Sequence, residues 1–128
     1  MAFPSREIVK RVRIDYPIGT RVRLVRMDDE QAPPIGTKGT VTGVDDTASI
    51  MVDWDSGSHL NVVYEEDSCA KLDPVTTICY RQKDGWEDRQ EAVNFFLRAT
   101  AGSEGSEQSR YVKIYQELLM GYEVATDE

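Results

Sequence analysis

The chain has 128 residues, of which 40% are hydrophobic and 30% charged, a composition typical of a globular domain rather than of a disordered segment. No apolar run approaches the roughly 18 residues that a membrane-spanning helix needs, and the polar start predicts no secretory signal peptide. Two cysteines without C-x-x-C spacing indicate reduced thiols. We therefore expect a cytoplasmic protein, and no motif implies a cofactor.

Charge is distributed unevenly along the chain, whose formal net charge is −8. Residues 1–26 carry +5, whereas residues 27–72 carry −8 and residues 73–128 carry −5. An acidic body repels nucleic acid, while a basic N-terminal segment can contact phosphate. Acidic loops that keep a small protein soluble are the simpler explanation of this pattern.

The N-terminal segment, residues 1–16, is predicted to hold a short basic helix. Ile8, Val9 and Val12 form an apolar stripe at helical spacing. Ser5 can cap the first turn, because its hydroxyl can accept a hydrogen bond from a free backbone N–H.

The hydrophobic period changes to two over residues 17–82, which predicts a series of short strands. Glycine, proline and aspartate clusters separate these strands at near-regular spacing, and "VTTICYR" is counted as the last strand. Short strands with frequent turn signals favour a small β-barrel over a βαβ fold.

The C-terminal part, residues 85–128, returns to a helical period, with Tyr111, Ile114 and Leu118 on one face. The short connection "AGSEGS" predicts that two helices form an antiparallel hairpin. Because each helix has a single apolar face, we expect the pair to pack on the barrel. The predicted fold class is α+β, with an N-terminal short helix, a small β-barrel and a C-terminal antiparallel helical hairpin.

The stretch "DWDSGSH" places the only histidine, His59, close to Asp53 and Asp55. These residue types could hold a metal ion or act as acid and base. A hairpin with a three-residue loop sets Ile50 opposite Val62 and gives one apolar face. That register makes Asp53 and His59 an outward-facing pair and Asp55 a turn former. We favour the hairpin, and keep a metal-dependent enzyme at Asp53 and His59 as an alternative.

Three acidic clusters fall in predicted loops. Solvated turns are the simplest explanation, and calcium or magnesium binding would require the clusters to converge, since none has the twelve-residue spacing of a calcium loop. As one face, they could instead imitate a nucleic-acid backbone and bind the basic groove of a protein partner. The candidate protein-binding residues are Asp28, Asp29, Glu30, Asp45, Asp46, Glu65, Glu66 and Asp67.

Basic side chains gather in the first 26 residues. They form either a solvated helix face with arginines paired to the acidic loops, or a surface that contacts nucleic acid. Few aromatic residues accompany them for base stacking. The candidate nucleic-acid-binding residues are Arg6, Lys10, Arg13, Arg21 and Arg23. Nothing indicates a catalytic nucleophile, because His59 is the only histidine available to either cysteine.

Three motifs between residues 15 and 72, "YPIGTRVRLVRMDD", "APPIGTKGTVTGVDD" and "VDWDSGSHLNVV", together resemble a bacterial family catalogued as domain of unknown function 4314. The G-T-V and W-D-x-G pattern is also similar to SH3-like barrels such as the KOW and Mib/Herc2 modules. The resemblance implies an SH3-like fold and an origin on phages and conjugative elements. It implies no catalytic residues.

From these observations we expect a non-enzymatic binding protein of a bacterial mobile genetic element. Its acidic surface would bind a protein partner, such as a nucleic-acid-binding host protein or nuclease, and an anti-CRISPR-like inhibitor of host defence fits this description. A nucleic-acid-binding accessory protein that uses the basic N-terminal region is the alternative.

Overall fold

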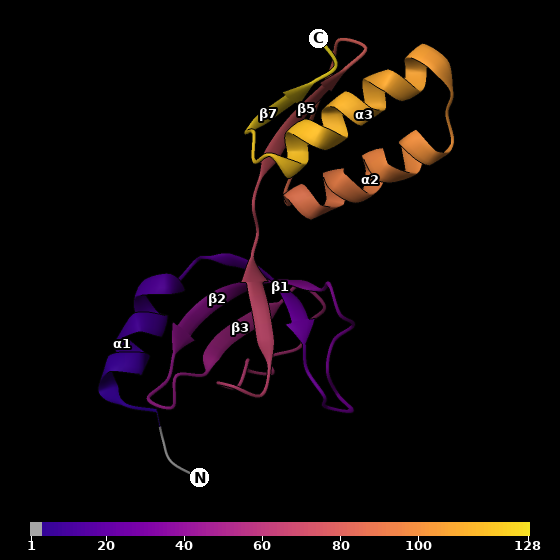
Figure 1. Ribbon diagram of the computed structural model, residues 1–128. Coiled ribbons are helices and arrows are strands. Elements are labelled where there is room, and N and C mark those ends of the chain that lie inside the picture. The colour runs from indigo at the N-terminus through magenta and orange to yellow at the C-terminus, as the bar shows by residue number, and fades with distance from the viewer. Residues whose placement is uncertain (1–3) are drawn as a thin grey trace. The chain divides into compact units, whose positions relative to one another are not determined.

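The computed structural model describes residues 4–128, which divide into two compact units with the boundary after Lys71 (Figure 1). Each unit is α+β and has its own hydrophobic core, so the predicted fold class is right at this level. No helix in residues 4–128 is long and apolar enough to cross a membrane.

The first unit, Met1–Lys71, combines one helix with an antiparallel four-stranded sheet of order β3-β2-β1-β4. The helix forms as predicted, and the Ser5 hydroxyl accepts a hydrogen bond from the Ile8 N–H. Its elements are α1 (Arg6–Asp15), β1 (Arg21–Arg26), β2 (Lys38–Val44), β3 (Ile50–Trp54) and β4 (Ser68–Lys71).

The predicted closed barrel is not formed, because "HLNVVY" is not a strand. Only one bridge, between Ile50 and Val62, joins this stretch to β3, in the predicted register. The backbone around it bonds to side chains instead: the Leu60 carbonyl accepts from the Trp54 indole at 2.8 Å, and the Val63 N–H donates to the Asp67 carboxylate at 2.9 Å. The sheet therefore stays open between β3 and β4.

Alternating side chains of the sheet form the core of the first unit. Val22 and Leu24 of β1 are at most 1% exposed, and β2 and β3 add Val41 and Trp54. Helix α1 packs on β2 and contributes the buried Val9. The core thus fixes the helix to the sheet, with the basic side chains of α1 outside.

The second unit, Leu72–Glu128, has two helices and a three-stranded sheet of order β6-β5-β7. Strand β5 pairs antiparallel with β6 and parallel with β7. The predicted barrel segment 17–82 thus extends past the unit boundary, since β5 belongs to this second sheet. The elements are β5 (Val75–Cys79), β6 (Gln82–Trp86), α2 (Arg89–Ala101), α3 (Gly105–Leu119) and β7 (Val124–Thr126).

Helices α2 and α3 lie side by side and bury their apolar faces against this sheet (Figure 1). Phe96 of α2 meets Ile114 and Leu118 of α3, and the sheet contributes Val75 and Ala125. The sequence predicted the barrel as the surface that covers these faces. In the structure, a sheet of the same unit covers them, because Ala125 of β7 and Trp86 at the end of β6 join Val75 of β5 against the helices.

Candidate functional site

The hairpin that carries the only histidine does not bring three ligands together. The His59 Nδ1 lies 2.8 Å from the Asp53 carboxylate, and both side chains are exposed, as predicted. Asp55 lies in the hairpin turn, as predicted, but its side chain bonds to another strand: its two oxygens accept from the Arg21 guanidinium at 2.9 and 2.7 Å. Those hydrogen bonds, the largest cause, lower the pKa of Asp55. In residues 4–128, no three His, Cys, Asp or Glu side chains are placed to hold a metal ion.

Two of the three acidic clusters converge on one hollow of about 530 Å³, although more than 30 residues separate them in the sequence. Five of the eight candidate protein-binding residues line it. We call it the acidic hollow; its lining residues are Arg26, Met27, Asp28, Asp29, Leu60, Asn61, Val63, Glu65, Glu66 and Asp67.

The carboxylates of the acidic hollow differ in their partners. Asp29 accepts from the Gln31 N–H at 2.7 Å and Asp67 from the Val63 N–H, so these two side chains shape the turns. Asp28 lies 3.5 Å from the Arg26 guanidinium, and both side chains are largely exposed. Glu65 and Glu66 are exposed and have no ion-pair partner within the described residues.

The remaining candidate acids lie elsewhere. Asp45 and Asp46 form the turn between β2 and β3, and Glu30 is exposed beside the acidic hollow without lining it. Burial opposes ionisation of Asp45, but hydrogen bonds from Thr47 and Ser49 outweigh it and lower the pKa of Asp45. The predicted acidic face is thus divided between one hollow and one turn.

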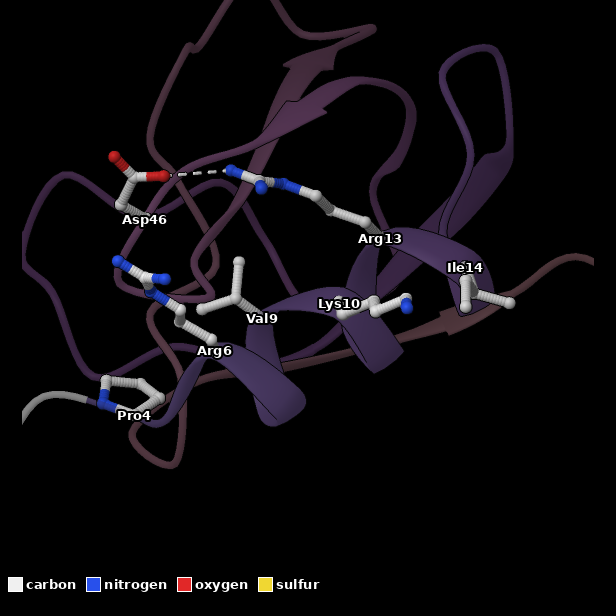
Figure 2. A pocket seen from close by; sticks show the side chains of 7 residues that line it. All are labelled: Pro4, Arg6, Val9, Lys10, Arg13, Ile14 and Asp46. Atoms are coloured by element: carbon white, nitrogen blue, oxygen red, sulfur yellow. Dashed lines mark hydrogen bonds and ion pairs between the residues drawn. The ribbon is translucent and has the colours of Figure 1, made fainter.

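A second hollow, of about 720 Å³, runs along α1, and we call it the basic hollow. Figure 2 shows Arg6, Lys10 and Arg13 around it, with Asp46 at the rim. The Arg13 guanidinium donates to the Val44 carbonyl and to Asp46 at 3.0 Å. Its other lining residues are Pro4, Val9 and Ile14.

The predicted basic set is therefore only partly gathered in one place. Arg6, Lys10 and Arg13 share the hollow, but Arg21 lies on β1 and pairs with Asp55, and Arg23 lies on the same strand. The pairing of Arg13 and Arg21 with carboxylates agrees with the simpler explanation for those two arginines.

Sequence reasoning missed the uncharged lining of the acidic hollow. Met27 is buried, Leu60 and Asn61 are half-buried, and Val63 is 38% exposed. Leu60 and Val63 follow the hairpin loop, where the alternating pattern assigned them to a strand. The signal that could have identified them is the pair of acidic clusters just after β1 and just before β4, since these strands are neighbours in the sheet.

Neither cysteine is an activated nucleophile. Burial raises the pKa of the Cys69 thiol to about 11. Burial also raises the pKa of Cys79, with a further contribution from the charge of Asp127. Both thiols are free, and the protonated form dominates at neutral pH.

Comparison with known proteins supports the unit boundary seen in the structure. The model of a family described as a domain of unknown function (DUF4314) matches residues 5–72. The match includes α1 and ends at the boundary between the two units, so the basic helix is part of the family domain. No curated protein matches the chain. Since the match covers more than half of the 128 residues, the chain belongs to the DUF4314 family.

Proposed function

We propose that the first unit is a non-enzymatic binding module that holds a basic segment of a protein partner in the acidic hollow. The observation that carries this proposal is the convergence of Asp28 and Asp29 with Glu65, Glu66 and Asp67 on one concave surface. Convergence of like charges raises the local negative potential and attracts cationic side chains.

The mixed lining of the hollow supports a peptide as the ligand. Leu60 and Val63 offer apolar contact beside the carboxylates, and Asn61 offers an amide. A lysine or arginine has an apolar stem and a charged head, so this combination suits it better than a purely charged surface would. The partner segment is therefore basic and carries apolar residues between its cations.

The free carboxylates determine where the cation binds. Asp29 and Asp67 already accept backbone hydrogen bonds that shape the turns. Glu65 and Glu66 have no ion pair within the described residues, so their oxygens are available to a ligand. These two residues make the main contribution to binding, with Asp28 in support.

The specific form of this proposal is an inhibitor that covers the nucleic-acid groove of a host defence protein, encoded by a mobile element. The acidic hollow and the net charge of −8 support it, because basic grooves accept acidic surfaces. We also propose an SH3-like architecture for the first unit, supported by its antiparallel four-stranded sheet with register shifts in β1 and β2, since such irregularities bend strands.

The test uses the full chain and fluorescein-labelled peptides in which lysine or arginine alternates with leucine, measured by fluorescence anisotropy. We expect saturable binding that weakens at least about tenfold in Glu65→Lys/Glu66→Lys. The control is Asp84→Lys/Glu123→Lys, which makes the same charge change on exposed residues of the second unit. Equal loss in both variants, or no binding by the parent chain, would overturn the proposal.

A further inference from the structure

The basic hollow along α1 is independent of the proposed protein-binding function. Arg6 and Lys10 line it, are exposed, and have no ion-pair partner among residues 4–128. Arg11, on the same helix, is also exposed and unpaired within that range. Helix α1 thus carries three exposed cationic side chains without ion-pair partners in the described residues, although the chain as a whole has a net charge of −8.

We propose that this face of α1 binds the phosphate backbone of a nucleic-acid duplex. Residues four apart are separated by about 6 Å along a helix axis, so Arg6 and Lys10 form a row of cations that can contact successive phosphates. Contacts of this kind carry no sequence information and position a protein on the duplex.

Contacts with the sheet fix the position of α1 and therefore of the cationic side chains along it. Arg13 donates through its Nε and a terminal nitrogen to the Val44 carbonyl, at 3.2 and 3.1 Å, and Val9 is buried against the sheet. Arg13 also neutralises Asp46, the carboxylate at the rim of the hollow (Figure 2). Arg13 is thus a positioning residue, and Arg6 and Lys10 make the contacts.

The face suits a duplex better than a single strand. Single-strand binding depends on aromatic side chains on which bases stack. Tyr16, which follows α1, packs against the core, and the Lys71 ammonium lies 5.2 Å from the centre of its ring. Among residues 4–16, no other aromatic side chain occurs, so α1 offers charge without a stacking platform.

The acidic hollow does not oppose this binding. It includes the loop that follows β1, which lies across the first unit from α1 (Figure 1). Repulsion between exposed charges falls off over about 10 Å at 0.1 M salt. An acidic peptide is the competing ligand. Because Ile14 of the lining is exposed and could contact its apolar side chains, the test includes such a peptide.

The experiment measures binding of a fluorescently labelled double-stranded DNA of about 20 base pairs, from about 50 to about 200 mM salt. For two or three phosphate contacts, the logarithm of the affinity should fall against the logarithm of salt with a slope of about −2 to −3. Arg6→Gln/Lys10→Gln should weaken binding at least about tenfold at the lowest salt. Its salt dependence should also be weaker, with a slope less negative than that of the parent chain by about 2.

A matched control removes the same charge from the second unit. Arg81→Gln/Lys83→Gln changes two exposed cations of the β5–β6 hairpin and should keep the parent slope. An unchanged circular dichroism spectrum and an unchanged urea midpoint followed by Trp54 fluorescence show that the test variant remains folded. No duplex binding by the parent chain, or the same slope in parent and test variant, would overturn the proposal. Tighter binding of a glutamate-rich peptide or of single-stranded DNA would also overturn it.

Discussion

Gly39 of β2 packs directly against residues of β3, so that adding a single methyl group there should lower the stability of the first unit. A Cβ at this position would lie 2.6 Å from Val52 Cγ1, 2.8 Å from Trp54 Cε3 and 3.0 Å from the Asp53 carbonyl oxygen. Val52 and Trp54 are 2% and 3% exposed, so neither has room to move. The "GTV" sequence here therefore needs glycine for space.

Gly39→Ala should destabilise the first unit by about 1–2 kcal/mol. Overpacking a core by one methyl group costs about 1–3 kcal/mol, and the lower entropy of the unfolded alanine chain offsets about 0.4–1 kcal/mol of that. Because the free energy of unfolding changes by about 1–3 kcal/mol per molar urea, the midpoint should fall by about 1 M.

The chain offers a clean reporter for this measurement, since it has two tryptophans, one in each unit. In a Trp86→Phe background, urea denaturation followed by Trp54 fluorescence reports the first unit alone. Gly43→Ala on the same strand is the control, because its Cβ would meet only the end of the flexible Met51 side chain. An unchanged midpoint for Gly39→Ala, or an equal loss for Gly43→Ala, would refute the reasoning.

Two further predictions concern Asp45 and Cys69. Asp45→Ala removes the acceptor of three hydrogen bonds and should cost about 1–2 kcal/mol at neutral pH. The pKa of Asp45 is lowered in the folded protein, so its stabilisation is present above the ordinary value of 3.8 and is lost as the pH falls through the lower folded value. The difference in urea midpoint between parent and variant should therefore be largest at neutral pH and should shrink progressively as the pH falls below 3.8. Cys69, with a pKa of about 11 against an ordinary 9.0, should react with iodoacetamide about 100-fold more slowly in the native protein than in urea. Mass spectrometry of the labelled peptides measures this, and equal rates would contradict the buried position of the thiol.

The first unit was largely predictable because its local signals agree with its packing. Ser5 and the apolar stripe of α1 mark a helix, and alternation in β3 and in "HLNVVY" gives the register that pairs Ile50 with Val62. The prediction of a closed barrel was wrong because of contacts between distant side chains and the backbone, which the local sequence pattern does not show. The Trp54 indole and the Asp67 carboxylate bond to the backbone of the segment between β3 and β4, which competes with strand pairing.

The sheet of the second unit was missed because its strands lack the usual pattern. β6 is mostly exposed and polar, and β7 has three residues. The turn between β5 and β6 uses Tyr80 and Arg81 at φ of 50° and 66°, where glycine or asparagine normally signals a hairpin. Distant residues hold this turn: Asp127 accepts from the Tyr80 N–H, and the Arg110 guanidinium stacks over the Tyr80 ring.

The candidate surfaces were predictable in kind but not in arrangement. The acidic clusters were visible as loops, yet only the pairing of β1 with β4 shows that residues 28–29 meet residues 65–67 and not residues 45–46. Similarly, the sequence could not separate Arg13, which fixes α1 to the sheet, from Arg6 and Lys10, which face outward.

The parallel pairing of β7 with β5 determines when each unit can fold during synthesis. All strands of the first sheet precede residue 72, so that sheet can assemble while the ribosome is still translating the helices. Strand β5 must wait for residues 124–126 before its second edge is covered. Until then, the backbone N–H and C=O groups on that edge can pair with other chains. A polypeptide that ends before residue 124 would therefore contain a folded first unit and an aggregation-prone second unit.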